Sequence, residues 1–219
     1  MPAWSYSALS SFETCPRRHF LTRVSKAVKE PESEALRWGN YVHKALEDRL
    51  KDSKPLPTTL STHEAFCQKV ESIEDAKLLV EYEAAITKEF QPTGWWDRNV
   101  WCRSKWDLGI LKGNALGIYD WKTGKRKLDI DQMELFALSA FIHIPDVEVV
   151  TSGYVWLKDK KIDREKFRRD QAPEIWSRWL PRVERFDQAF AQNKWPAKPS
   201  GLCRKWCPVG KHNCEHCGE

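Results

Sequence analysis

The sequence predicts a mixed α/β fold in which a helical N-terminal part precedes a central sheet. Residues 5–22 and 33–51 carry apolar side chains at helical spacing, and the pattern changes to strand-like alternation after Trp96. A helix pattern, a strand pattern and a second helix pattern then follow one another. This order of elements indicates a mixed sheet flanked by helices.

Length and composition are those of a protein that can bury a substantial core. We expect the 219 residues to form one domain, with a mainly helical part over 1–95, an α/β core over 96–192 and a Cys-rich tail over 193–219. The net charge of +5 favours a polyanionic partner only mildly. Apolar runs fall short of the roughly 20 residues that cross a membrane, and the N-terminus lacks a signal-peptide layout. We therefore expect a cytoplasmic protein with reduced thiols and no membrane partner.

Helices are predicted over most of the first ninety residues. The first opens with hydroxyl residues and breaks at Pro16, which cannot continue a helix. Residues 33–51 predict an amphipathic helix with a charged outer face, and 52–61 predict a loop. Residues 62–90 predict one or two further helices, whose inward side chains would be Leu78, Leu79, Tyr82, Ala85 and Ile86.

A β-hairpin is predicted directly after this helical part. The segment NVWCRSKWDLGIL (99–111) alternates with a period of about two, KGN (112–114) supplies a turn, and ALGIYDW (115–121) forms a second strand. If these strands pair across the turn, Asp107 and Asp120 lie near the same end of the hairpin and could share a cation.

Three elements are predicted to follow the hairpin. The first is a helix over 128–143, the second a strand over 147–157 and the third a helix of about 20 residues that starts at Pro173. The first helix places four apolar side chains on one face: Met133, Phe136, Ala137 and Ala140.

The end of the hairpin carries residue types suited to phosphodiester hydrolysis. Lys122 is two residues beyond Asp120, so both side chains point to one face of an extended strand. Two carboxylates can bind Mg²⁺ or Mn²⁺ through oxygen, and an adjacent ammonium can orient water or offset charge on a phosphate. Asp-x-Lys alone is more often a surface ion pair beside a turn. Gln132 and His43 strengthen the functional interpretation, because both are placed to reach the hairpin end.

These segments resemble the consecutive motifs of the RecB-like branch of the PD-(D/E)XK nuclease superfamily. WGNYVHKALE matches a histidine that follows G-x-x-V, WDLG…IYDWKTGK matches the hairpin motifs, and DQMELFALSAF matches a glutamine that opens the next helix. Phe136 stands where that family usually has a tyrosine, so a hydroxyl contact there is lost. The resemblance extends from Ser5 to about Cys217 and implies a restriction-endonuclease-like core: a mixed sheet of four or five strands flanked by helices.

The resemblance also implies a metal centre for Mg²⁺ or Mn²⁺. Lys122 would position the attacking water, and Gln132 would orient the lysine or that water. The two acids of the hairpin would act in catalysis as metal ligands. The full implied ligand set is His43, Asp107, Asp120 and the backbone carbonyl of Trp121.

The cysteines predict a second metal site, for which two interpretations stay open. In the first, Cys15 and three tail cysteines bind a [4Fe–4S] cluster; the stretch SYSALSSFETCPRR resembles the N-terminal motif of CRISPR-adaptation exonucleases and AddB-type helicase–nucleases, which have this arrangement. In the second, the tail alone binds zinc, with His212 or His216 as substitute ligands. Thiolates suit both metals, but Cys15 has no evident purpose outside the cluster. The tail cysteines, in C-x3-C-x6-C-x2-C spacing, are Cys203, Cys207, Cys214 and Cys217.

Basic and aromatic side chains are candidates for contacts with DNA. Arg17, Arg18, Lys125 and Arg126 would bind phosphates, although a solvated charged face explains such runs equally well. Among the 12 tryptophans most must be core, and the pair after the Pro-Thr-Gly loop is the best exposed candidate. The tryptophans considered for base stacking are Trp4, Trp38, Trp95, Trp96, Trp106 and Trp121. The remaining cysteines, Cys67 and Cys102, stand in apolar patterns and are expected in the core.

The sequence therefore favours a metal-dependent DNA nuclease, expected to be an exonuclease that acts on single strands or DNA ends in recombination, repair or phage DNA metabolism. Its compactness favours a phage relative, in which case it would work in the host cytoplasm. The alternative is a nuclease fold that holds DNA or a recombination partner without cutting. Asp107, Asp120 and Lys122 are intact, which argues against this alternative. A homo-oligomer stays open.

Overall fold

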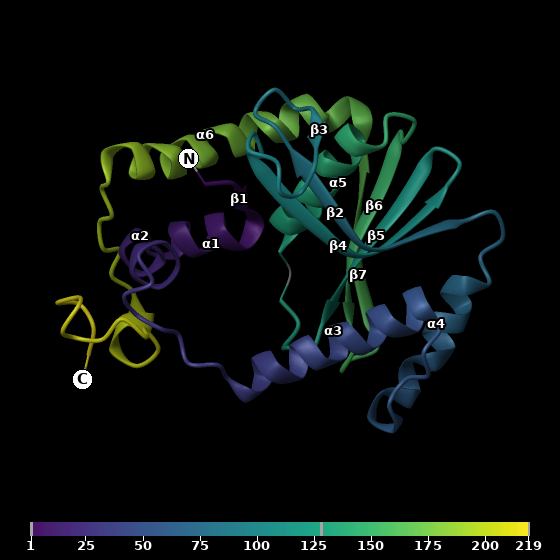
Figure 1. Ribbon diagram of the computed structural model, residues 1–219, viewed down its shortest axis with the longest axis horizontal. Coiled ribbons are helices and arrows are strands. Elements are labelled where there is room, and N and C mark those ends of the chain that lie inside the picture. The colour runs from purple at the N-terminus through teal and green to yellow at the C-terminus, as the bar shows by residue number, and fades with distance from the viewer. Residues whose placement is uncertain (1, 128, 219) are drawn as a thin grey trace. The chain divides into compact units, whose positions relative to one another are not determined.

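The computed structural model describes residues 2–127 and 129–218 (Figure 1). The chain divides into two compact units, and each is described by itself. The larger unit comprises Ser33–Trp176, and the smaller comprises Met1–Glu32 with Ser177–Glu219. Among the described residues, no helix is both long enough and apolar enough to span a membrane.

The larger unit is built on a mixed sheet with strand order β3-β2-β4-β5-β6-β7 (Figure 1). Strands β5 and β6 are parallel, and the other neighbours along this path are antiparallel. The β4–β5 hairpin closes where Lys112 pairs with Ala115, around Gly113 with φ +56°. The strands are β2 (Lys77–Ile86), β3 (Pro92–Thr93), β4 (Cys102–Lys112), β5 (Ala115–Lys122), β6 (Val149–Trp156) and β7 (Lys161–Arg168).

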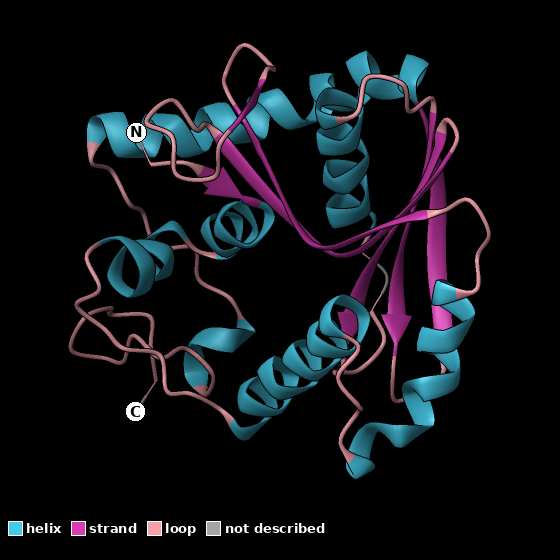
Figure 2. Cartoon of the chain, turned by 45° about the vertical axis from the view of Figure 1, so that its right-hand side comes forward, coloured by secondary structure: helices cyan, strands magenta, loops and turns pink. Residues whose placement is uncertain are grey.

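Helices cover both faces of this sheet (Figure 2). On one face lie α3 (Glu34–Asp52), the 3₁₀ turn Thr58–His63 and α4 (Glu64–Glu71). We call the apolar cluster beneath them the α3-side core; it joins Val42, Leu46, Leu50, Leu60, Cys67 and Val70 to the strand residues Leu108, Trp121 and Val155. On the other face lies α5 (Ile130–His143), whose residues 133–141 are all buried. The parallel β5–β6 crossover thus runs through a helix packed on the sheet.

The smaller unit has an aromatic core. Its elements are β1 (Trp4–Ser5), α1 (Tyr6–Thr14), α2 (Pro16–His19), the π-helical turn Phe20–Val24, α6 (Ala172–Gln192, from Ser177 on) and the 3₁₀ turn Gly201–Arg204. The helix break predicted at Pro16 is present, with Pro16 as the first residue of α2. The ring of Phe12 packs edge-on against Phe186 at 5.2 Å, and Trp4 stacks on Trp179 at 5.8 Å between centroids.

The predicted fold class is confirmed: a mixed sheet flanked by helices, with four of the seven cysteines in the C-terminal region. The predicted hairpin, the helix of α5, the strand of β6 and the helix of α6 are all present. Leu128, at which one helix was predicted to begin, lies outside the described residues, and α5 begins at Ile130.

One segment was predicted wrongly. Residues 62–90 contain a helix only over Glu64–Glu71, and Lys77–Ile86 form strand β2. Leucine, glutamate and alanine in this stretch favour helices, but nine residues of β2 pair with β4, and this long-range pairing decides the conformation. The strand β7 (Lys161–Arg168) was also missed, because charged residues dominate it and hide its pairing along the whole of β6.

Candidate active site

The candidate site lies where β4 and β5 stop pairing. The last paired residues are Leu108 and Tyr119, so Asp107 and Asp120 are the next residue on each strand. The Trp121 backbone N–H donates a buried hydrogen bond of 2.7 Å to Asp107 Oδ2, which bridges the separating strands. Asp107 and Asp120 are only 9% and 7% exposed. The hairpin therefore brings two buried carboxylates to one place, as its sequence pattern predicts.

Asp120, Lys122 and Gln132 contact one another in a triangle. Lys122 Nζ lies 2.7 Å from Asp120 Oδ2 and donates to Gln132 Oε1 at 3.0 Å, while Gln132 Nε2 donates to Asp120 Oδ1 at 3.0 Å. Asp120 Oδ2 is buried, and among the described residues the ion pair with Lys122 balances its charge. The triangle fixes the ammonium and leaves an acceptor for a further cation.

The electrostatics of Asp120 reflect this crowding. Burial raises the pKa of Asp120 to about 6, the negative charge of Asp107 acts in the same direction, and the ammonium of Lys122 opposes both. Negative charge at Asp120 therefore costs free energy in the folded protein when no cation is bound.

His43 reaches the same place from α3. Its Nε2 donates to the Trp121 carbonyl oxygen at 2.9 Å, and its Nδ1 lies 3.3 Å from Asp107 Oδ2. Burial lowers the pKa of His43, but the hydrogen bond to Asp107 and the charges of Asp107 and Asp120 outweigh this effect and raise it. His43 is thus coupled to both carboxylates.

The donor atoms fit a hard divalent cation. Carboxylates, a backbone carbonyl and one imidazole are a ligand set that Mg²⁺ or Mn²⁺ accepts. Neighbouring ligands around a six-coordinate ion at about 2.1 Å lie about 3 Å apart. The spacing of 3.3 Å between His43 Nδ1 and Asp107 Oδ2 is close to this value.

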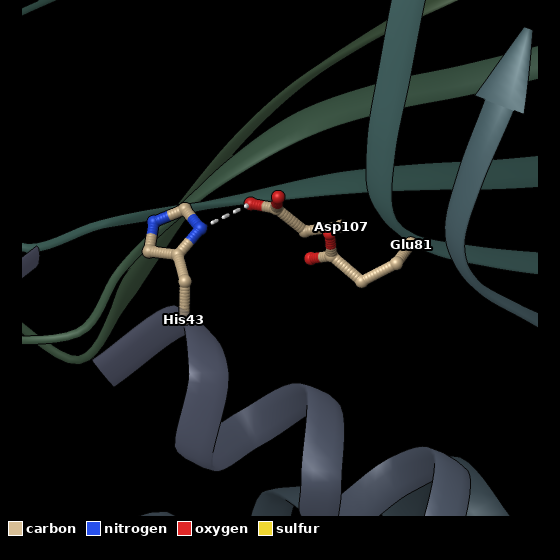
Figure 3. Close-up of side chains that lie close together, drawn as sticks. All are labelled: His43, Glu81 and Asp107. Carbon is tan, nitrogen blue, oxygen red and sulfur yellow. Dashed lines mark ion pairs between the residues drawn. The ribbon is translucent and has the colours of Figure 1, made fainter. Parts of the chain in front are cut away.

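Two residues at the site were missed by the sequence analysis. Glu81, assigned there to a helix, is on β2, and its carboxylate and the ligand atoms of His43 and Asp107 all lie within 4.8 Å of one another (Figure 3). Tyr154 on β6 donates from its hydroxyl to Asp129 O at 2.8 Å and to Gln132 Oε1 at 3.2 Å. Long-range pairing places both residues, so the local pattern carried no signal for either contact.

The ring of Tyr154 also supports the lysine of the site. Lys122 Nζ lies 4.6 Å from the centroid of this ring, a cation–π distance. Phe136, at the position where a tyrosine was expected, is buried in α5 and 3% exposed. Tyr154 therefore brings a phenolic hydroxyl to Gln132 from a different element.

The five cysteines that are candidates for the four ligand positions line one cavity in the smaller unit. Burial raises the pKa of the Cys217 thiol to about 12, and contacts with Cys207 and Cys214 act in the same direction. Backbone N–H groups point at two other sulfurs, from Lys198 to Cys15 Sγ and from Ser200 to Cys203 Sγ, each at 3.4 Å. His216 also lines this cavity.

The chemistry of the residues that line this cavity suits a thiolate-bound metal. Without a metal, thiolates in contact repel one another, whereas a bound cation favours the deprotonated form. The position of Cys15 beside the tail cysteines distinguishes it from Cys67 and Cys102, which are 0% and 1% exposed in the larger unit.

The predicted basic contacts are distributed over both units. In the smaller unit Arg17 Nε donates to Asn213 O at 3.1 Å, and Arg18 forms an ion pair of 2.9 Å with Glu30. In the larger unit Arg126 pairs with Asp163 through two nitrogens, and Lys125 is exposed. Three of the four cations thus already have a partner within the protein.

The tryptophans separate into core and surface. Trp4, Trp106 and Trp121 are 1%, 0% and 2% exposed and cannot stack on a base without unfolding. Trp38 and Trp96 are 45% and 82% exposed. Of the pair Trp95–Trp96 that was predicted to be exposed, Trp96 is exposed and Trp95 is half-buried.

Residues 3–106 match the sequence model of the PD-(D/E)XK nuclease superfamily. Two of the solved structures that resemble this chain cover nearly all of it. A protein from Eubacterium rectale named "Putative exonuclease" has a TM-score of 0.59 at 12% identity, covering 97% of this chain and 88% of its own. A protein named SSO0001 has a TM-score of 0.51 at 14% identity, covering 99% of this chain and 87% of its own. At such identities these structures show a shared fold. No curated protein sequence matches the chain.

Proposed function

We propose that the protein is a metal-dependent deoxyribonuclease that hydrolyses phosphodiester bonds at the Asp107–Asp120 site. One observation carries the proposal: two buried carboxylates, 9% and 7% exposed, meet beside a lysine that other side chains hold in place. Burying adjacent carboxylates destabilises a fold unless a cation shares them. The superfamily match over residues 3–106 supports the same class of enzyme.

The residues that would hold the cation are His43, Asp107, Asp120 and the Trp121 carbonyl. When bound, Mg²⁺ or Mn²⁺ would supply charge to polarise a phosphate oxygen and to lower the pKa of water. The Trp121 N–H fixes one oxygen of Asp107 at 2.7 Å, which orients the carboxylate. The His43 N–H to Trp121 O contact orients the imidazole in the same way.

Lys122 would act on the phosphate and the attacking water. Its ammonium is held by Asp120 at 2.7 Å, by Gln132 at 3.0 Å and over the Tyr154 ring. An ammonium fixed in this way offsets the charge that develops on a phosphate under attack, and it orients a water by hydrogen bonding. Gln132 positions the lysine, because its amide contacts both Lys122 and Asp120.

We further propose that the activity is exonucleolytic, with preference for single strands or DNA ends. The name of the Eubacterium rectale structure favours exonuclease action, and its fold resembles this chain along 97% of the length. The exposed Lys125 and Trp96 offer a phosphate contact and a stacking surface. Partners in recombination or repair, a phage setting and a cytoplasmic location belong to the same proposal.

The cysteine cavity would hold a structural [4Fe–4S] cluster. The observation in favour is that Cys15 lines the same cavity as the four tail cysteines, because a zinc site local to the tail would not require it. Iron and zinc analysis of protein purified without oxygen, together with the visible absorption of the sample, tests this assignment. One zinc per chain without iron would overturn it.

Cleavage of end-labelled DNA tests the proposed activity. Parent protein and Asp120→Ala would be compared on single- and double-stranded substrates with Mg²⁺, Mn²⁺ or EDTA. Label release that requires metal and is lost in Asp120→Ala is expected, and the end released first gives the polarity. Binding without cleavage by folded parent protein would instead support the non-cleaving module.

A further inference from the structure

Glu81 has a backbone conformation that is unusual for a strand. It lies within β2, yet its φ is +53°, in the left-handed region that disfavours residues with a Cβ atom. The strand continues on both sides, with Val80 paired to Leu108 and Tyr82 paired to Trp106. The unfavourable conformation is therefore confined to one residue of an otherwise regular pairing.

At this position both strands change the face of the sheet on which they bury their side chains. Val80 and Leu108 pack in the α3-side core. Tyr82 and Trp106 instead stack on each other at 4.7 Å and contact α5, through Tyr82 Oη to His143 Nδ1 and through Trp106 Nε1 to Ser139. Residues two apart on a strand normally share a face.

Both strands thus change the face that they bury at Glu81 and Asp107. These two residues lie between the two cross-strand pairs, so they stand opposite each other on neighbouring strands. Like charges opposite each other destabilise a sheet. A left-handed glutamate opposite a buried aspartate is thus unfavourable for the metal-free fold in two ways.

The geometry at this point suits a cation. The ligand atoms of His43, Glu81 and Asp107 lie within 4.8 Å of one another (Figure 3), and the three side chains are 34%, 14% and 11% exposed. All three line one open cavity of about 500 Å³. A cation there would relieve the repulsion between the two carboxylates, and the cavity would admit it.

An ion pair with Lys105 does not explain the position of Glu81. Lys105 Nζ is 2.5 Å from Glu81 Oε2. However, the direct cross-strand partner of Lys105 is Glu83, which is exposed and has an ordinary strand position. Glu83 could therefore pair with Lys105, and the left-handed conformation of Glu81 is not needed to neutralise this lysine.

We propose that Glu81 is a further ligand of the divalent cation that His43 and Asp107 hold, and that Lys105 competes with the cation for this carboxylate. The proposal rests on the proposed function, since it concerns the same metal centre. It adds a third carboxylate, from a strand that the sequence motifs leave out, and it assigns Lys105 as the neutralising partner when the metal is absent.

Direct binding of Mn²⁺ tests the proposal without relying on activity. The paramagnetic resonance signal of free Mn²⁺ would be titrated with the full-length parent, Glu81→Gln and Glu83→Gln. Glu83→Gln is the matched control, because it removes one negative charge two residues away. We expect Glu81→Gln to weaken binding by about 10- to 100-fold and Glu83→Gln by about 2-fold or less. Equal effects of the two variants would overturn the proposal.

Two more variants sharpen the test. Lys105→Met removes the competitor and is expected to tighten Mn²⁺ binding by about 3-fold or more. Glu81→Gly suits φ +53° and is expected to raise the melting temperature while it weakens Mn²⁺ binding. If Glu81→Gly lowers the melting temperature and leaves Mn²⁺ binding intact, Glu81 is a structural residue and the proposal fails.

Asp107→Asn separates this proposal from the proposed function. If the parent binds Mn²⁺, Asp107→Asn abolishes that binding and Glu81→Gln leaves it unchanged, the metal centre stands and only the role of Glu81 is refuted. If the folded parent binds no Mn²⁺ and cleaves no DNA, both proposals fail.

Discussion

The two proposed metal centres differ in the secondary structure that holds their ligands. In the larger unit the carboxylate site lies at the ends of two paired strands, and hydrogen bonds such as Trp121 N–H to Asp107 hold it without metal. In the smaller unit four of the five cysteines lie in residues 193–219, whose only regular element is a 3₁₀ turn, within the described part of the chain. We infer that the first site is preorganised for a reaction and that the second depends on its metal for order.

Lys122→Met gives the largest effect and tests preorganisation in the larger unit. The change keeps the length of the side chain but removes the charge at the phosphate, so cleavage should fall by about 100- to 1,000-fold. Single-turnover cleavage of labelled DNA measures the rate in folded protein, and the melting temperature should also fall, because buried Asp120 loses its ion-pair partner. Lys125→Met, an exposed lysine three residues away, is the matched control, and an equal loss in this variant would mean that only bulk charge matters.

Cys207→Ser tests the dependence of the smaller unit on metal. Loss of one thiolate should empty the site and loosen the tail, so that proteolytic cleavage within residues 193–219 becomes about 100-fold faster. Iron and zinc analysis and limited proteolysis measure the two effects. Cys67→Ser, in the α3-side core, is the control that should keep its metal. An unchanged metal content in Cys207→Ser would remove Cys207 from the ligand set.

His19 should make the smaller unit sensitive to acid. Burial lowers the pKa of His19 to about 4, and the charge of Arg23 adds to the effect. Because the unfolded state binds the proton more readily, stability falls as the pH drops from about 6.5 toward 4. Relative to neutral pH, the free energy of unfolding should fall by about 2 kcal/mol at pH 5. This loss should disappear in His19→Phe, because a phenyl ring suits the surrounding Phe12, Phe186 and Trp195.

The larger unit should respond in the opposite direction through His43. Its pKa is raised, so protonation of His43 favours the metal-free fold at pH values below its ordinary pKa, and this contribution is lost as the pH rises. Hydrogen exchange of each unit at pH 5 and pH 7, corrected for intrinsic rates, distinguishes the two. Equal acid sensitivity of both units, or its persistence in His19→Phe, would contradict the assignment.

Tyr154→Phe should give the smallest effect. The change removes the hydroxyl that contacts Gln132 and Asp129 but keeps the ring beneath Lys122. Gln132 therefore loses one of the hydrogen bonds that orient it. Cleavage should fall by about 3- to 10-fold. Tyr119→Phe, on the neighbouring strand β5 and against the α3-side core, should have less effect. A larger loss in Tyr119→Phe would show that packing, rather than the hydroxyl, is responsible.

The sequence predicted what local patterns determine. Alternation on both sides of KGN predicted the hairpin, and the equal distance of Asp107 and Asp120 from that turn placed them together. The 3.6-residue period predicted α3 and α5, which present His43 and Gln132. These residues form the part of the candidate site that the sequence alone locates.

What sequence reasoning missed depends on pairing between distant segments. Helix-favouring residues hid β2 and with it Glu81, because only the ladder with β4 makes Lys77–Ile86 a strand. Tyr154 reaches Gln132 because β6 lies parallel to β5, a neighbour relation that no local pattern encodes. The left-handed backbone of Glu81 likewise belongs to the point where β2 and β4 both change the face that they bury.

The measurement that tests the central claim most directly compares cleavage and DNA binding in Asp120→Asn. This variant keeps the shape of the side chain and its contact with Gln132. It removes the negative charge of a carboxyl group whose pKa burial raises to about 6. We predict that metal-dependent cleavage is lost, that affinity for DNA in Ca²⁺ stays within about 3-fold of the parent, and that thermal stability does not fall. Cleavage at the parental rate by folded Asp120→Asn would contradict the account.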